Sequence, residues 1–272
     1  MPGRRKVFGT RVAEKLLDLL GRWIELKYPF DDSQVLAAFA VLEQYSKVVK
    51  WQGLSSFNSL RLEMEVERQS HLMFVEGGAA QVSSSHLTQL ARGDFSQVVL
   101  SRKSIRNYKD VPVDPALLEK AVSMATQSPS SCNRQSTHVF FTTEVNQILE
   151  LLRLQGGSRG FSELVPALLL VTGDIGSFGG GGDRKQLGID AGLFSMTLMY
   201  AIGYLGLSSC ALNWAATPGK DRRLRKLKVI PDDHDLVMMM AVGYAPSDVA
   251  VALSHRTEVN RIFHRLNYEG WN

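Results

Sequence analysis

Residues 101–135 read SRKSIRNYKDVPVDPALLEKAVSMATQSPSSCNRQ and contain two polar clusters with a helical segment between them. The first cluster is basic, and the second is a dense run of small polar residues. Asp114-Pro115 predicts the start of the helix, because an acidic N-cap followed by proline suits the first turn. Ser128-Pro129 predicts its end. Anion- and amide-binding groups on both sides of one helix indicate a cradle for a polar, phosphorylated cofactor.

The composition of the 272-residue chain, with 44% hydrophobic and 21% charged residues, is typical of a soluble globular protein. Its net charge of +4 suits an anionic cofactor but is too small for a nucleic-acid footprint. Cys132 and Cys210 stand in no zinc-type spacing, and no HExxH pair occurs, so no metal site is expected. The run 191–219 has no charged residue, and it is interpreted as a buried helix and strand instead of a membrane span.

Residues 11 to about 90 are expected to be helical. Apolar residues recur at helical spacing in the stretches 11–27 and 34–49. The stretch 59–74 alternates like a strand at first, but its strong helix formers favour a helix. Glu76–His86, EGGAAQVSSSH, is the expected linker. The predicted domains are a helical extension, 1–93, and a cofactor-binding domain, 94–272.

Four apolar segments of the second domain predict buried strands that alternate with helices. A mixed α+β or α/β protein is therefore expected, with a sheet layered by helices. The predicted strands are THVFFTT (137–143), LVPALLLVTGD (164–174), LGLSSCALN (205–213) and, last, DLVMMMAVGY (235–244); the predicted helices are 144–155, 186–204 and 221–228.

Arg102, Ser104 and Arg106 lie two residues apart, so on an extended segment their side chains project to one side. Arginine binds oxyanions through a bidentate fork, and the three side chains therefore suit a phosphate. A surface basic turn is the alternative. In the second cluster, residues 129–135, hydroxyls and carboxamides suit ribityl hydroxyls and the imide edge of a ring, although the same residues also form ordinary loops.

Taken in order, Arg-x-Ser-x-Arg, the Pro-led helix and PSSxNxQ before a strand resemble the FMN-dependent nitroreductase superfamily. The resemblance spans roughly Phe95 to Asn267 and includes the helix IDAGLFSMTLMYAIGYLGL, which looks like the family's central dimer-forming helix. It implies a nitroreductase-like α+β fold, an α/β three-layer arrangement with a mostly antiparallel central sheet flanked by helices. The N-terminal helical extension resembles that of a subgroup associated with polysaccharide gene clusters.

The resemblance also implies roles for individual residues. Arg102 and Arg256 would bind the FMN phosphate, with Ser104 near the ribityl chain. Arg106 would lie at the pyrimidine edge, where a fixed cation stabilises reduced flavin. The residues 129–135 would reach the flavin mainly across a subunit interface, and 212–214 would lie beside N5 in place of the usual Pro-x-Glu-Gly-type run. The remaining implied cofactor contacts are Lys103, Pro129, Ser130, Ser131, Asn133, Gln135, Leu212, Asn213 and Trp214.

The implied activity is that of a cytoplasmic, homodimeric flavoenzyme without a catalytic side chain beyond the electrostatic role of Arg106. It would take hydride from NADH or NADPH onto flavin N5 and reduce a second substrate, such as a nitroaromatic or a quinone, by a ping-pong mechanism. A flavin-dependent dehydrogenase or dehalogenase, and a non-enzymatic interaction protein, stay open as alternatives. A Rossmann dehydrogenase lacks its fingerprint here. Arg159 either contacts the nicotinamide cofactor or is a surface arginine.

Overall fold

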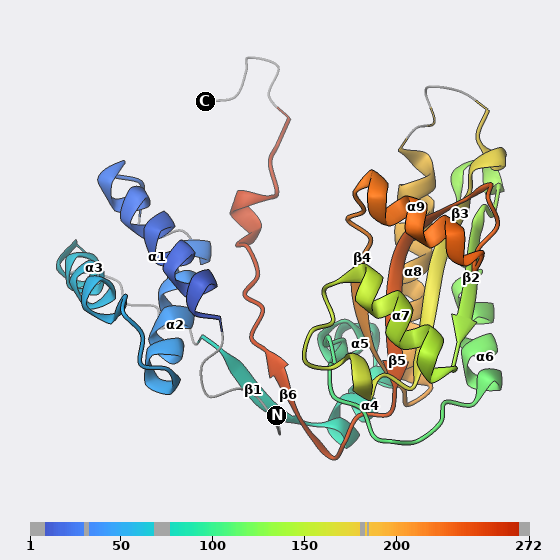
Figure 1. Cartoon of the computed structure of the whole chain (residues 1–272), viewed down its shortest axis with the longest axis horizontal. Helices are drawn as coiled ribbons and strands as arrows, with labels where there is room; N and C mark the ends of the chain where they lie inside the picture. The colour runs from blue at the N-terminus through green and yellow to red at the C-terminus, as the bar shows by residue number, and fades with distance from the viewer. Residues whose placement is uncertain (1–8, 30–32, 68–76, 180–182, 184, 267–272) are drawn as a thin grey trace. The chain divides into compact units, whose positions relative to one another are not determined.

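The computed structural model describes residues 9–29, 33–67, 77–179, 183 and 185–266 (Figure 1). Its contacts divide the chain into two compact units. Unit 1 comprises Met1–Ala80 and Ala252–Asn272, and unit 2 comprises Gln81–Val251. These units group the chain differently from the predicted domains 1–93 and 94–272, and that domain assignment stays a prediction.

Unit 1 contains three helices, α1 (Thr10–Glu25), α2 (Ser33–Val48) and α3 (Leu54–Glu67). The helix predicted over the ambiguous stretch is thus confirmed as far as Glu67. On α1 the buried residues Ala13, Leu17 and Leu20 follow helical spacing, so one face of the helix enters the core. The other core residues of this unit are Val35, Phe39, Leu42, Val49, Trp51 and Phe57.

Unit 2 is built on a four-stranded antiparallel sheet with the order β2-β3-β5-β4. All four predicted strands form it, as β2 (Thr137–Thr142), β3 (Ala167–Asp174), β4 (Ser208–Asn213) and β5 (His234–Gly243). The sheet is covered on both faces, because consecutive residues of β3 are buried and enter different cores. Leu168 and Leu170 belong to one core, whereas Leu169 and Val171 belong to the other.

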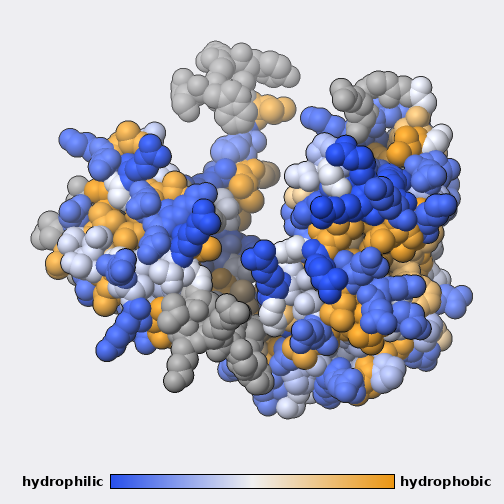
Figure 2. Space-filling view, in the orientation of Figure 1, coloured by the Kyte–Doolittle hydropathy of each residue, from blue (hydrophilic) through white to orange (hydrophobic). Residues whose placement is uncertain are grey.

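Helices cover each face of this sheet, which confirms the predicted three-layer α+β arrangement (Figure 1). Helices α6 (Pro115–Ala125) and α8 (Gln186–Tyr204) pack on one core, and α7 (Val145–Gln155) and α9 (Pro218–Leu227) pack on the other. The predicted start at Asp114-Pro115 is present, and α9 also begins with a proline after its N-cap. The Asp114 side chain accepts a hydrogen bond from the backbone N–H of Ala116, and Thr217 accepts one from Lys220. Helix α9 buries Leu224 and leaves a strongly hydrophilic outer face (Figure 2).

Helix α8 is the described helix whose length and mean hydropathy of 1.2 would allow it to cross a membrane. It instead lies against the sheet, since Ala191, Leu198 and Ile202 are fully buried with Leu169 and Val171 of β3. The interpretation of the uncharged run as a core helix followed by a strand is confirmed.

Two predictions at the ends of unit 2 were wrong. The expected linker contains β1 (Ala79–Ser83) and the start of α4 (Ser84–Ala91), and β5 is not the last strand. It is followed by β6 (Asp248–Ala252), which pairs with β1 in a separate two-stranded sheet. The residues of β1 are alternately exposed and partly buried, so the strand has no apolar run from which it could be recognised.

Gly243, at the end of β5, lies where the chain passes close to Tyr108 and Pro166. A Cβ at this position would lie 2.6 Å from Cγ of Pro166 and 2.8 Å from Cδ1 of Tyr108. We expect Gly243→Ala to lower the free energy of unfolding by about 1–3 kcal/mol, because overpacking forces neighbours to shift. Chemical denaturation measures this. Gly219→Ala on α9, where the added Cβ would meet only Oγ1 of Thr217 at 3.9 Å, is the control and should not be destabilised; equal stabilities would contradict the expectation.

Candidate functional site

The basic cluster follows helix α5 (Phe95–Ser101) on an extended segment that runs along β4. Ile105 is 2% exposed, and its backbone N–H donates to the carbonyl of Ser209 at 3.0 Å. Arg102, Ser104 and Arg106 are partly exposed, as expected if the segment turns alternate side chains away from the core. The segment is thus a fixed support for two guanidiniums and a hydroxyl.

Tyr108 fixes the far end of this segment from inside the core. Its hydroxyl donates to the carbonyl of Ile105 at 2.7 Å and lies 3.2 Å from that of Ala241 on β5. Burial raises the pKa of Tyr108 well above its usual value, and the neighbouring Cys210 raises it further. The phenol therefore acts as a neutral hydrogen-bond donor that joins the segment to the sheet.

The pKa of Cys210 on β4 is affected by both arginines. Burial raises the pKa of its thiol, while Arg106 and Arg102 act in the opposite direction, Arg106 more strongly. Both guanidiniums are therefore close enough to β4 to act electrostatically on Cys210. The thiol is buried and is a neutral neighbour of the cations rather than a nucleophile.

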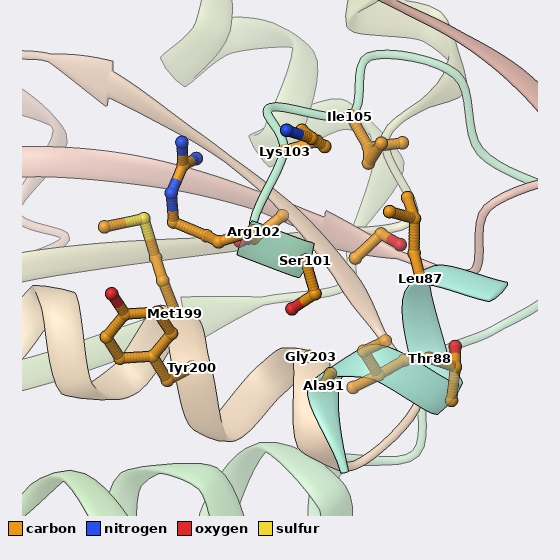
Figure 3. Close-up of a pocket in the computed structure, with 13 residues that line it drawn as sticks. Leu87, Thr88, Ala91, Ser101, Arg102, Lys103, Ile105, Met199, Tyr200 and Gly203 are labelled. Atoms are coloured by element: carbon orange, nitrogen blue, oxygen red, sulfur yellow. The ribbon is translucent and has the colours of Figure 1, made fainter. Parts of the chain in front are cut away.

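Arg102 lines a small cavity of about 40 Å³ between the segment, α8 and the start of β4 (Figure 3). Lys103, which is exposed, belongs to the same lining. From α8 come Met199 and Tyr200. Sites for drug-sized ligands usually enclose about 300–1,000 Å³, so this cavity can receive only part of a cofactor.

The second cluster forms a tight, strained loop. Cys132, Asn133 and Gln135 have φ values of 52°, 55° and 50°, in the left-handed region that residues with a Cβ rarely adopt. The Ser130 hydroxyl oxygen accepts from the backbone N–H of Gln135 at 3.0 Å, and the Gln135 side-chain amide donates to the Asn133 amide oxygen at 3.2 Å. Several side chains predicted to contact the cofactor therefore also shape their own loop.

This loop lines a cavity of its own, of about 90 Å³, and shares no lining residue with the Arg102 cavity. Within one copy of the chain, Arg102 and Lys103 of the first cluster line one cavity, and Pro129, Ser130 and Gln135 of the second cluster line the other. The lining residues are Thr126, Ser128, Pro129, Ser130, Gln135, Thr137, Asp190 and Phe194.

The predicted N5 loop lies at the end of β4. Leu212 is buried, and the carbonyl of Asn213 accepts a hydrogen bond from the Gln155 side chain at 2.9 Å. Trp214 packs against the core, and its indole N–H is buried without a hydrogen-bond partner among the described residues. Arg256 is exposed and belongs to unit 1, so its role as a second phosphate ligand stays a prediction.

Sequence reasoning missed the residues that hold these loops. Asp190 of α8 is 2% exposed and accepts from the backbone N–H of Ser131 at 3.0 Å and from Gln186 at 2.7 Å. Arg134 forms an ion pair with Asp183 at 3.0 Å and stacks on Phe178. One signal was present for Asp190, because it immediately precedes the uncharged run.

Comparisons with known proteins are consistent with this geometry. Residues 99–169, about a quarter of the chain, match the model of the nitroreductase family. A candidate nitroreductase from Exiguobacterium sibiricum, solved in complex with FMN, aligns with a TM-score of 0.56 and 21% identity over 64% of this chain and 98% of its own. Unit 2 has the nitroreductase fold.

Two further structures with the nitroreductase fold give similar values. A candidate NADH dehydrogenase/NAD(P)H nitroreductase from Parabacteroides distasonis has a TM-score of 0.53 and 22% identity over 66% of this chain and 99% of its own. A candidate NAD(P)H:FMN oxidoreductase from Staphylococcus epidermidis has a TM-score of 0.56 and 18% identity over 64% of this chain and 96% of its own. The N-terminal helices precede the matched region. Among curated proteins, no sequence match was found.

Proposed function

We propose that unit 2 binds FMN non-covalently and works as an NAD(P)H-dependent oxidoreductase. The observation that carries the proposal is the Arg102–Arg106 segment, which Ile105 hydrogen-bonds to Ser209 of β4 within the family-matched part of a nitroreductase fold. Arg102 and Arg256 would bind the phosphate, with Ser104 towards the ribityl chain. Guanidinium forks and a hydroxyl are the donors that a phosphate and a sugar alcohol require.

The ring would lie over β4, where Arg106 is fixed near Cys210. Bound FMN supplies hydride acceptance from NADH or NADPH and delivery to a second substrate. The chain's own contribution is a permanent positive charge at the pyrimidine edge, from Arg106, and the N–H groups of the 212–214 loop. Since Asn213 is fixed through Gln155, this loop is pre-organised.

The cofactor site would be completed by a second copy of the chain. Two observations support this homodimer. Neither the 40 Å³ cavity nor the 90 Å³ cavity can enclose FMN; Arg102 lines the first, and Ser130 and Gln135 line the second. In addition, α8 buries one face against the sheet while Ile189 and Leu193 are 51% and 45% exposed. The 129–135 loop of one copy would then contact the FMN held by the arginines of the other.

The electron acceptor is proposed only as a class, a nitroaromatic or quinone-like compound reduced in a ping-pong cycle. A cytoplasmic location, and the relation of residues 1–93 to the subgroup associated with polysaccharide gene clusters, stay predictions. So does a contact between the exposed Arg159 and the nicotinamide cofactor.

An absorption spectrum of the purified protein, recorded anaerobically before and after NADH or NADPH is added, tests the proposal. We expect oxidised flavin bands that are bleached by the nicotinamide cofactor. A colourless protein that takes up no added FMN would contradict the cofactor assignment. Flavin bands that persist under NAD(P)H would instead favour a flavin-dependent dehydrogenase or dehalogenase.

A further inference from the structure

We propose that Asp190 is a positioning residue for the flavin: its carboxylate fixes the strained 131–135 loop in the shape that presents Ser130, Asn133 and Gln135 to FMN. This inference rests on the function proposed above. It concerns a residue that lies some 55 positions further along the chain from the loop it holds, on a different element.

The loop needs a restraint from outside because its backbone conformation is unfavourable. Three of its five residues have positive φ, and a residue with a Cβ in the left-handed region costs about 1–2 kcal/mol. Asparagine tolerates this region, but Cys132 and Gln135 have no such preference. Side-chain bonds inside the loop, from Gln135 to Ser130 and to Asn133, are exposed to solvent and therefore stabilise it little.

Asp190 supplies the restraint from the interior. One carboxylate oxygen accepts from the backbone N–H of Ser131, where the tight turn begins, and the other accepts from the Gln186 side chain. A charge-assisted hydrogen bond from a side chain that is 2% exposed is stronger than one at the surface. Since α8 is packed on the sheet, Asp190 joins the loop to the core of the domain.

A second contact on α8 supports this arrangement. The Ser128 hydroxyl donates to the Thr197 hydroxyl oxygen at 2.7 Å. Residues 190 and 197 are seven positions apart, two helical turns, so both contacts lie on the same face of α8. The chain is therefore attached to one face of α8 at two points, at Ser128 before the loop and at Ser131 within it. Only the Asp190 contact reaches the strained residues 131–135.

The test compares Asp190→Asn with wild type in the full-length protein, using FMN titration and amide hydrogen exchange. A carboxamide offers one acceptor oxygen where the carboxylate offers two, so one of the two donors loses its partner. We expect roughly tenfold weaker FMN binding and faster exchange in residues 131–137. The matched control is Glu119→Gln, the same chemical change at an exposed position of α6, and it should alter neither measurement.

A rescue variant separates positioning from general destabilisation. Glycine adopts positive φ without strain, so Cys132→Gly lowers the conformational cost of the loop. The loop then depends less on the Asp190 contact. In the Asp190→Asn background, it should recover part of the FMN affinity. If Asp190→Asn does not fold, Gln186→Ala replaces it, because it removes only the bond that orients the carboxylate; we expect about threefold weaker binding.

The outcomes are distinguishable. A wild-type protein that binds no FMN contradicts the proposed function, and this inference with it. If the wild type binds FMN, unchanged affinity in the Asp190→Asn and Gln186→Ala variants overturns the inference alone. Unchanged exchange in residues 131–137 also overturns it, as does a loss of affinity that Cys132→Gly leaves entirely uncorrected.

Discussion

Replacing Arg102 with alanine is expected to weaken FMN binding about 10- to 150-fold. A hydrogen bond to a charged group contributes about 1.5–3 kcal/mol, and each 1.4 kcal/mol corresponds to a factor of ten. Arg102 is partly exposed and lies at the end of α5, where the buried Ile105 fixes the backbone behind it. Its removal should therefore leave the fold unchanged and act on the cofactor alone. Isothermal titration of the apoprotein with FMN measures the effect.

The matched control for this prediction is Lys109→Ala. It removes one positive charge from the same segment, and the backbone bond from Lys109 to the carbonyl of Tyr244 is kept. Its affinity for FMN should stay within a factor of two or so of wild type, since screening weakens distant surface charges. The FMN affinity of Arg102→Lys should lie between those of Arg102→Ala and Lys109→Ala, because lysine keeps the charge but lacks the planar fork. Wild-type affinity in Arg102→Ala would refute phosphate binding by this residue.

Leu193→Glu is expected to convert the protein to a monomer that no longer retains FMN. Leu193 is 45% exposed on α8, the helix proposed to meet its counterpart across the dimer axis. A carboxylate there would be buried against apolar surface and against its own symmetry mate, at a cost of several kcal/mol. At least a hundredfold weaker dimerisation follows. Analytical ultracentrifugation with detection at flavin and protein wavelengths reports assembly and cofactor content together.

Val145→Glu is the control for this substitution. Val145 is 66% exposed at the start of α7, on the opposite face of the sheet, so the same charge is added to another apolar surface position. This variant should remain dimeric and yellow. The isolated Leu193→Glu subunit should keep its fold, because the position is exposed within one subunit. A Leu193→Glu protein that is monomeric and still binds FMN tightly would contradict the shared site.

The fold of unit 2 could be predicted because its signals are local. Leu168–Val171 are continuously apolar, Asp114-Pro115 and Thr217-Pro218 mark helix starts, and Gly156 ends α7 with φ of 84°. Strand β1 could not be found in this way. Its sequence, AAQVS, contains no continuous apolar run, and its pairing with β6, some 165 residues later, makes the segment a strand.

In the candidate site, too, features with local sequence signals could be predicted, whereas features that depend on contacts between distant segments could not. The alternate spacing of Arg102, Ser104 and Arg106 predicted that they share one side of an extended segment, and all three are partly exposed on such a segment; their contact with a cofactor stays a prediction. The role of Asp190 was not recognisable, because it depends on a contact between α8 and a loop that sequence spacing does not encode. The positive φ values of Cys132 and Gln135 were equally hidden, as neither residue type favours that conformation.

The pairing of β1 with β6 places the two ends of unit 2 next to each other. Near these ends, the backbone N–H of Ser84 donates to the carbonyl of Ser247 at 2.9 Å. Residues 81–251 thus form a continuous insertion whose entry and exit coincide, the arrangement in which circular permutation and transplantation into a host loop are best tolerated. Unit 2, which has the nitroreductase fold, is therefore built as a transferable module.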